Sequence, residues 1–154
     1  MNNDVPRTAL ITGAAKRIGR AMALDLAAHG WAVAVHFNSS EADAVQVCDE
    51  IVQAGGRAAP VRADLEREDD CQALVKRATA ALGPLTLLIN NASIFEKDSP
   101  ETATRESWDA HMQINLRAPF VLVQEFSATL PKDITGHVIN IVDQRVWNLT
   151  GSFT

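Results

Sequence analysis

The stretch Ala9-Leu10-Ile11-Thr12-Gly13-Ala14-Ala15-Lys16-Arg17-Ile18-Gly19 runs from a short apolar segment through a glycine-rich turn into a helical pattern. In a parallel α/β sheet, the first strand-to-helix turn binds the pyrophosphate of a dinucleotide, because the helix N-terminus offers N–H groups and a partial positive charge. Gly13 would allow a tight turn, and Gly19 would let the helix approach the strand closely. Two glycines at this spacing also occur in plain tight turns, so the interpretation depends on the rest of the chain.

Short apolar runs alternate with longer stretches of helical periodicity along the whole sequence. Runs that are apolar at consecutive positions are typical of strands buried on both faces, and strict alternation indicates right-handed crossovers. The sequence therefore predicts an α/β fold, a Rossmann-type doubly wound parallel sheet with helices on both faces, in one domain over residues 1–154. The expected strands are 9–11, 32–35, 58–61, 85–89 and 137–142, and the expected helices are 18–29, 40–52, 71–82 and 106–130.

The composition excludes several classes of protein. The 154 residues carry 14 Lys and Arg against 19 Asp and Glu, and the formal net charge of −5 argues against binding to nucleic acid or anionic lipid. No apolar stretch is long enough to span a membrane, and residues 1–6 lack the features of a secretory signal. Cys48 and Cys71 lie in helical patterns without metal-ligand spacing, so we expect free thiols, a cytoplasmic location and no metal site.

The end of the second expected strand bears on the choice of nucleotide. Proteins that bind the ribose 2′-hydroxyl of NAD place an acidic residue about 20 residues after the glycine turn. Residues 35–40 read Val-His-Phe-Asn-Ser-Ser, so Asn38, Ser39 and Ser40 could donate hydrogen bonds to a 2′-phosphate that Arg17 would neutralise. The sequence favours NADP(H) over NAD, although one of the serines could instead cap the following helix.

Four motifs in this order resemble those of the short-chain dehydrogenase/reductase family. They are Thr12-Gly13-x-x-x-Arg17-x-Gly19, Asp64-Leu65 after the third strand, Asn90-Asn91-Ala92-Ser93 after the fourth, and Asn115 in the fourth helix. Within the family the chain is most similar to pteridine reductases and dihydromonapterin reductases, on three departures from the commoner pattern. Arg17 replaces the middle glycine, Ser93 replaces another glycine, and Asp143 stands where most members carry the catalytic serine.

The resemblance implies a role for each matching residue. Asp64 and Leu65 would hold the adenine, and Asn90, Asn91 and Ala92 would line the nicotinamide side of the cleft. A helix N-cap at Asp64 and an ordinary Asn-rich turn are the structural alternatives. The residues expected at the cofactor are Gly13, Lys16, Arg17, Ile18, Gly19, His36, Asn38, Ser39, Ser40, Asp64, Leu65, Asn90, Asn91 and Ala92.

The substrate would lie beyond the fourth strand. The resemblance places Ser93 and Phe95 against it, and Phe95 would stack a pterin ring against the nicotinamide, unless it only fills local core. Pro119 has no N–H, so it frees the Asn115 carbonyl and favours a kink in the helix. In the family this carbonyl holds a water of the proton relay, which makes Asn115 a candidate catalytic residue.

Asp143 follows the last expected strand at the edge where open α/β sheets bind ligands. Its carboxylate could donate or relay a proton, or could be solvated and paired with Arg145, and Trp147 could wall the same pocket. Family members deliver the proton through a Tyr-x-x-x-Lys pair that, counted from Asp143, falls just beyond Thr154, and the sequence holds no tyrosine. We therefore expect a longer polypeptide whose C-terminal part is missing here.

The leading hypothesis is thus an NADPH-dependent reductase of a small-molecule substrate, a pterin or another carbonyl compound. The first alternative is a carbonyl reductase similar to 3-oxoacyl-carrier-protein reductases, which ordinarily keep serine at position 143. The others are a nucleotide-binding module without catalysis and a flavodoxin-like FMN domain. The resemblance implies a homotetramer, and the apolar residues 119–123 fit a helical interface, although core packing explains them equally well.

Overall fold

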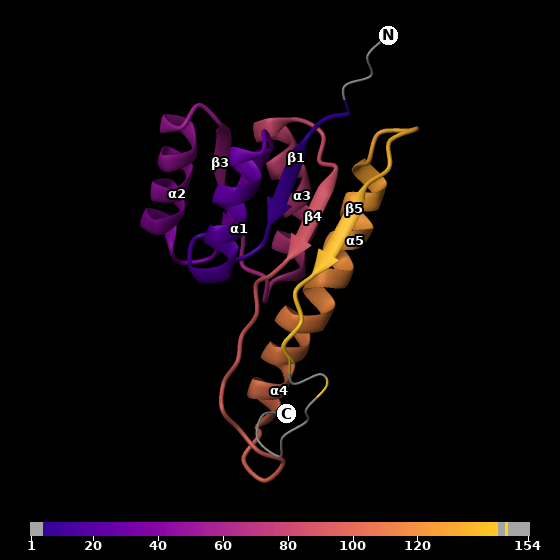
Figure 1. Ribbon diagram of the computed structural model, residues 1–154. Coiled ribbons are helices and arrows are strands. Elements are labelled where there is room, and N and C mark those ends of the chain that lie inside the picture. Colours follow the sequence, from indigo (N-terminus) through magenta and orange to yellow (C-terminus); the bar gives the residue numbers. More distant parts are fainter. Residues whose placement is uncertain (1–4, 145–146, 148–154) are drawn as a thin grey trace.

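A five-stranded parallel sheet forms the centre of the protein. The computed structural model describes residues 5–144 and residue 147, and the strand order is β3-β2-β1-β4-β5 (Figure 1). The order changes direction at β1, which pairs with both β2 and β4, so the carboxyl ends of β1 and β4 form a topological switch point. The strands are β1 (Thr8–Ile11), β2 (Ala32–Phe37), β3 (Arg57–Arg62), β4 (Leu87–Asn90) and β5 (His137–Asn140).

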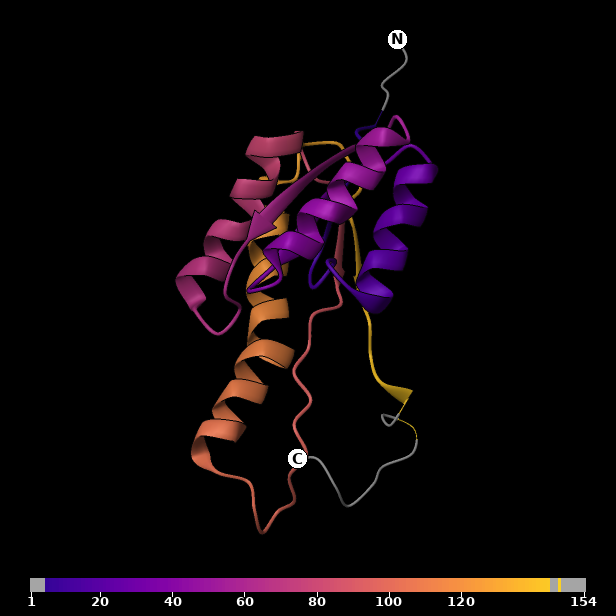
Figure 2. The ribbon, with the colours of Figure 1, turned by 90° about the vertical axis from the view of Figure 1, so that its left-hand side faces the viewer.

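Helices cover both faces of this sheet, which confirms the predicted doubly wound architecture (Figure 2). One buried cluster joins the sheet to α1 and α2, and another joins it to α3 and α5. No helix among the described residues is long and apolar enough to cross a membrane. The helices are α1 (Arg17–Ala28), α2 (Glu41–Gln53), α3 (Glu68–Leu82), α4 (Arg105–Met112) and α5 (Ala118–Thr129), with a π-helical turn, η1 (Gln113–Arg117), between the last two.

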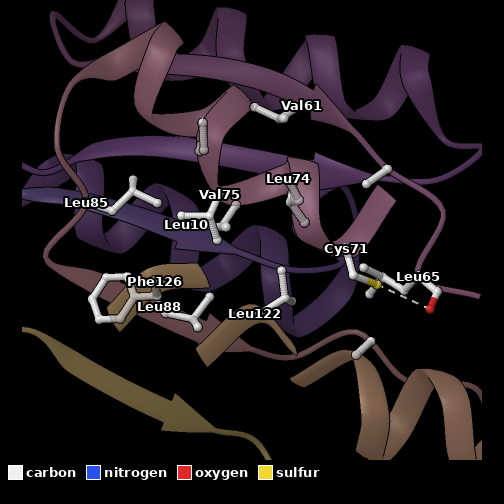
Figure 3. Close-up of a cluster of buried hydrophobic side chains, with 14 of the residues drawn as sticks. Leu10, Val61, Leu65, Cys71, Leu74, Val75, Leu85, Leu88, Leu122 and Phe126 are labelled. Carbon is white, nitrogen blue, oxygen red and sulfur yellow. Dashed lines mark hydrogen bonds between the residues drawn. The ribbon is translucent and has the colours of Figure 1, made fainter. Parts of the chain in front are cut away.

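The larger core lies between the sheet and the pair α3 and α5 (Figure 3). Successive side chains of a strand point to opposite faces, so Leu10 faces this core while Ile11 faces the core under α1 and α2. Leu88 of β4 joins Leu10, and Leu74 of α3 and Leu122 of α5 close the cluster from the helices. All of these side chains are fully buried.

Both cysteines are free and buried, as the sequence predicts. Burial raises the pKa of the Cys48 thiol and of the Cys71 thiol to about 11. Because the thiolate is the reactive form, both side chains act as small apolar groups of the core near neutral pH.

The last strand, β5, is more exposed than its apolar sequence suggests. β5 pairs with β4, and Val138 and Ile139 are 39% and 45% exposed. The strand also ends at Asn140, two residues before the end of the apolar run that predicts an interior strand. Within the described residues β5 is an edge strand with one hydrogen-bonded neighbour, so its apolar side chains are only half covered.

A π-helical turn stands where the sequence predicts a kink. Pro119 has no N–H to donate to the Asn115 carbonyl, and the turn before it widens so that Ala118 N–H donates to the Gln113 carbonyl five residues back. The helix therefore continues through the proline, and the expected span of 106–130 is confirmed within one residue at each end. Single π-helical turns often occur at functional sites.

Leu122→Ala tests the placement of the larger core. It removes a fully buried side chain and leaves a cavity between α5 and α3, so we expect the free energy of unfolding in urea to fall by about 2–5 kcal/mol. Leu116→Ala is the control, because Leu116 is 65% exposed and should lose less than about 1 kcal/mol. Equal losses in the two variants would contradict this packing.

Candidate functional site

The Thr12 hydroxyl joins the glycine turn to the segment that follows β4. The backbone N–H groups of Asn91 and Ala92 both donate to Thr12 Oγ1, each at 2.9 Å. The Asn91 side chain returns the contact, since its Nδ2 donates to the carbonyl oxygens of Thr12 at 2.8 Å and of Gly13 at 3.2 Å. The two motifs are therefore one rigid unit, although 77 residues or more separate them in sequence.

The two glycines of the turn are required by this contact. Gly13 has φ of +63°, and a Cβ there would lie 3.1 Å from Ala92 Cα. A Cβ on Gly19 would lie 2.3 Å from the Gly13 carbonyl oxygen and 2.7 Å from Asn91 Nδ2. Gly13 thus makes the turn and Gly19 permits the close approach of α1, as the sequence predicts.

The N-terminus of α1 is suited to an anion. Its first turn contains no acidic residue, and its N-cap residue, Lys16, makes no side-chain cap. The helices α2 and α3 differ, because their first turns carry two and three acidic residues respectively. Anionic groups are favoured at a helix N-terminus, and α1 leaves this place to a ligand.

Arg17 occupies a backbone conformation that usually favours glycine. Its φ is +51°, in the left-handed region, where a residue without a Cβ has no strain. Such strain is most often found at functional sites. Lys16 pairs with Asp43 at 3.0 Å, whereas Arg17 is exposed and has no ion pair among residues 5–144 and 147. The guanidinium is thus available to a phosphate.

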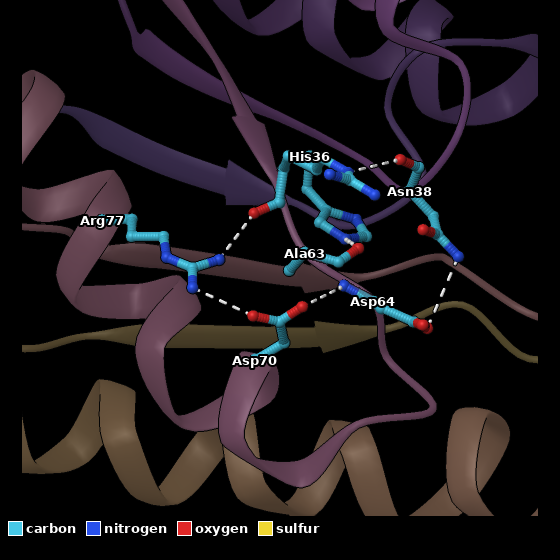
Figure 4. A network of polar contacts seen from close by, with 7 residues as sticks. His36, Asn38, Ala63, Asp64, Asp70 and Arg77 are labelled. Carbon is cyan, nitrogen blue, oxygen red and sulfur yellow. Dashed lines mark hydrogen bonds and ion pairs between the residues drawn. The ribbon is translucent and has the colours of Figure 1, made fainter.

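His36 of β2 supports the turn from a buried position. It is 2% exposed, Gly13 N–H donates to its Nδ1 at 2.9 Å, and its Nε2 lies 3.1 Å from the Ala63 carbonyl (Figure 4). Because Nδ1 accepts, Nε2 carries the proton and the ring is neutral. Burial lowers the pKa of His36 to about 4, against the opposing effects of the Ala63 carbonyl and the Asp70 charge. His36 therefore positions the glycine turn, and its contact with the cofactor stays a prediction.

Asp64 links two of the expected nucleotide-binding segments (Figure 4). Its Oδ1 lies 3.5 Å from Asn38 Nδ2 and accepts the Glu66 N–H at 3.0 Å, which is a local turn and not a helix N-cap. Asp64 N–H donates to Asp70 Oδ2 at 3.0 Å. That bond, followed by the Arg77 guanidinium, lowers the pKa of Asp70. The Asp64 carboxylate itself remains at the surface, beside the end of β2.

The other residues expected at the cofactor differ in their exposure. Asn38 and Ser39 are exposed after β2, and Ile18 is 59% exposed at the start of α1. Ser40 takes the N-cap position of α2, as the alternative predicts, although its side chain makes no cap hydrogen bond. Leu65 is buried, and its side chain belongs to the core under α3.

A cavity of about 590 Å³ opens beside the carboxyl ends of β4 and β5 and brings the expected substrate and catalytic residues together. Ser93, Phe95, Asn115 and Asp143 all line it, and Phe95 is 56% exposed. Trp147 is 86% exposed and does not line the cavity, so the prediction that it walls the pocket is wrong, and Arg145 lies outside the described residues. The other lining residues are Asn90, Ala92, Ile94, Leu116, Pro119, Phe120, Val123, Asn140, Ile141 and Val142.

A pair of amides lies at one end of this cavity and was not found from the sequence. Asn90 and Asn140 are partners in the β4–β5 register, and Asn90 Nδ2 donates to Asn140 Oδ1 at 2.8 Å. Asn90 is 5% exposed, and its Oδ1 has no hydrogen-bond partner within the described part of the chain. A buried amide oxygen normally has a partner, so this atom can accept a hydrogen bond from water or from a bound group. Only the strand register could have indicated the role of Asn140.

Residues 7–145 match the family described as short chain dehydrogenase. The chain belongs to this family. It is 31% identical over 135 residues to the 3-oxoacyl-(acyl-carrier-protein) reductase FabG of Staphylococcus aureus, which is 88% of this chain and 55% of that protein. It is 35% identical over 118 residues to a hydroxynaphthalene reductase-like protein of Metarhizium robertsii, which is 77% of this chain and 44% of that protein. The chain therefore spans about half the length of these curated relatives.

Two solved structures of proteins in complex with nicotinamide nucleotides share the fold. FolM alternative dihydrofolate reductase 1 from Brucella suis, in complex with NADP, has a TM-score of 0.91 and 42% identity, over 95% of this chain and 60% of that one. A blue fluorescent protein from a metagenomic library, in complex with NADPH, has a TM-score of 0.88 and 32% identity, over 95% and 60% of the two chains. Both likenesses confirm the Rossmann-type fold.

The neutral His36 predicts a specific loss of stability in acid. The pKa of an imidazole in the unfolded chain is about 6.5, above the folded value of about 4, so only the unfolded state binds the proton between these values. The contribution of the neutral His36 ring to the free energy of unfolding is fully present above about pH 6.5. It falls by about 3 kcal/mol as the pH approaches 4. Chemical denaturation at a series of pH values measures it.

Two variants isolate this contribution. His36→Gln should lack the part of the pH dependence that lies between about pH 6.5 and pH 4. His29→Gln should keep it, because the His29 side chain is 72% exposed. A profile of His36→Gln that is parallel to that of the wild type would contradict the buried, neutral ring.

Proposed function

We propose that this chain forms the cofactor-binding part, and one wall of the substrate cavity, of an NADPH-dependent reductase whose substrate is a flat heterocycle of the dihydropterin class. One observation carries the proposal. The uncapped N-terminus of α1, with the exposed Arg17, is joined through Thr12 and Asn91 to the cavity that contains Phe95 and Asp143. A phosphate site and a substrate cavity thus share one rigid unit.

The residues at the glycine turn fit a phosphorylated dinucleotide. The N–H groups of the first turn of α1 would face the pyrophosphate, and Gly13 and Gly19 leave no side chain to obstruct it. Asn38 and Ser39 are exposed hydrogen-bonding groups after β2, and Arg17 is an exposed cation at the start of α1, a combination that suits the 2′-phosphate of NADP. The structural relatives in complex with NADP and NADPH support this choice.

The cavity residues suit orientation and proton handling. Bound NADPH supplies a hydride, and the chain's own part is to hold the acceptor and to exclude water. Phe95 offers an aromatic face, and Asp143 adds a carboxylate to the lining of the same cavity. The 154 residues contain no tyrosine, so the Tyr-x-x-x-Lys pair of the family is not assigned to any residue of this chain.

The substrate class has one rival. Likeness to the dihydrofolate reductase of Brucella suis, together with Phe95 and Asp143, supports a dihydropterin. Likeness to the 3-oxoacyl reductase of Staphylococcus aureus supports a carbonyl substrate instead. A nucleotide-binding module without catalysis is the third candidate, and it would bind NADPH without turning over either class of substrate.

The proposal also includes a cytoplasmic homotetramer. Leu116 of η1 and Phe120 of α5 are 65% and 55% exposed on the surface of the long helix, and apolar side chains in such a place fit a helical interface. The net charge of −5 and the buried free thiols agree with a cytoplasmic protein. Analytical ultracentrifugation of the full chain measures the assembly.

Arg17→Gly separates the phosphate contact from the backbone strain. We expect the affinity for NADPH, measured by calorimetry, to fall about tenfold through loss of a charge-assisted contact, and the affinity for NADH to change less than about threefold. Stability should not fall, because glycine tolerates φ of +51° better than arginine. Arg20→Gln is the control, since Arg20 pairs with Glu50 and should keep the preference for NADPH. Equal losses for NADPH and NADH in Arg17→Gly would contradict the 2′-phosphate contact.

Phe95→Ala separates the two substrate classes. Stacking against an aromatic ring contributes about 0.5–1.5 kcal/mol beyond burial, so we expect binding of dihydrofolate in the presence of NADPH to weaken about two- to tenfold. Binding of an acetoacetyl thioester should change less, because it has no ring to stack. Val52→Ala, at an exposed apolar residue of α2, is the matched control. Binding of the thioester but not of dihydrofolate by the wild-type chain would favour the carbonyl reductase.

A further inference from the structure

The segment between β4 and α4 is held along one face of the long helix. Residues 91–99 form neither helix nor strand, and they run beside α4 and η1, as the hydrogen bonds between them show. The side chains that hold the segment are Ser107, His111 and Asn115, which are four residues apart. Residues at this spacing share one face of a helix, so the three form a stripe.

The first two contacts of this stripe are made to the backbone of the segment. Asn115 holds Ile94 twice, because its Oδ1 accepts the Ile94 N–H and its Nδ2 donates to the Ile94 carbonyl, both at 3.0 Å. His111 Nε2 accepts the Glu96 N–H at 3.2 Å. The contacts therefore fall on alternate residues of the segment, and each step of two residues matches four residues of the helix.

The match has a simple geometric basis. Four residues of α-helix rise about 6.0 Å, and two residues of extended chain rise about 6.6 Å. A third contact continues the series in the same direction, since Ser107 Oγ lies 3.3 Å from Asp98 Oδ2. Neighbouring side chains of an extended segment point to opposite sides. Ile94 accordingly packs against the core and also lines the cavity, while Phe95 is 56% exposed where it lines the same cavity.

His111 is the central contact, and its protonation state is fixed by geometry. The ring is 7% exposed, and Nδ1 lies 2.7 Å from the Ser107 carbonyl, which can only accept. Nδ1 therefore carries the proton, and the lone pair of Nε2 accepts the hydrogen bond from the Glu96 N–H. His111 does not line the cavity, so it acts on the cavity only through the segment that contains Phe95.

We propose that His111 is a positioning residue for the substrate: by holding the Glu96 backbone it sets the place of Phe95 over the cavity. The part of the inference that concerns the substrate rests on the proposed function of that cavity. The part that concerns the position of the segment rests only on the contact between His111 and Glu96. The contact is one hydrogen bond between a helix and an otherwise irregular segment. Its loss should loosen residues 95–97 without moving the glycine turn, which is held separately by Thr12.

The test uses three variants of the full chain. His111→Leu fills a similar volume with an apolar side chain and removes the Nε2 acceptor of the Glu96 N–H. His111→Gln can place an amide oxygen near the position of Nε2. His29→Leu is the control, because the His29 side chain is 72% exposed at the end of α1. Amide hydrogen exchange of residues 94–98 measures how firmly the segment is held, and calorimetry measures the binding of dihydrofolate and of NADPH.

We expect His111→Leu to exchange the Glu96 amide about three- to tenfold faster than the wild type, and to bind dihydrofolate about three- to tenfold more weakly. Its affinity for NADPH should stay within about twofold of the wild-type value. His111→Gln should restore both properties to within about twofold, and His29→Leu should change neither.

The two measurements test separate claims. An unchanged Glu96 exchange rate in His111→Leu would overturn the positioning role. So would equal weakening of NADPH and dihydrofolate binding, which would indicate a general loss of structure. Failure of the wild-type chain to bind dihydrofolate would count against the proposed function, and hydrogen exchange alone would then decide whether His111 holds the segment.

Discussion

The absence of a side chain at Gly19 is the constraint on which the site depends. A single methyl group there would overlap the Gly13 carbonyl oxygen at 2.3 Å and the Asn91 amide at 2.7 Å. These atoms belong to the turn after β1 and to the segment after β4, which meet at the switch point of the sheet. Because α1 lies this close, its N-terminus stands beside Asn91 and Ala92, and Ala92 lines the cavity. The proposed phosphate site and the proposed substrate cavity are therefore adjacent.

The turn is held from three directions, and each contact satisfies a backbone group. Thr12 Oγ1 receives two N–H groups of the β4 segment, Asn91 Nδ2 donates to two carbonyls of the turn, and His36 Nδ1 receives the Gly13 N–H. Because these groups already have partners, their role is to fix geometry. The groups that remain for a ligand are the next N–H groups of α1 and the Arg17 side chain. His36 thus serves the backbone of the turn, which is why it can be buried and neutral beside a helix N-terminus suited to an anion.

Local patterns in the sequence, namely the alternation of strands and helices and the glycine spacing, predicted the fold. The resemblance to the family, and not these patterns alone, predicted Ser93, Phe95, Asn115 and Asp143 as site residues, and the structure places all four along one cavity. The features that the sequence could not predict depend on long-range pairing. His36 follows a strand, as a cleft residue would, and only its contact with Ala63, 27 residues away, shows that it is buried. The Asn90–Asn140 pair and the contact of His111 with Glu96 depend in the same way on register between distant segments.

The two halves of the site are fixed by different kinds of interaction. The turn is held by glycines and backbone groups, because a side chain at Gly19 would overlap the Gly13 carbonyl oxygen and a side chain at Gly13 would be strained at φ of +63°. The segment with Phe95 is held by a stripe of helix side chains, and a change at Ser107 or His111 would alter its position without touching the turn. If Phe95 contacts the substrate as proposed, substrate preference can change through residues of one helix face while the glycine turn stays intact. Such an arrangement suits a family in which one fold serves different substrates, as the names of the relatives of this chain indicate.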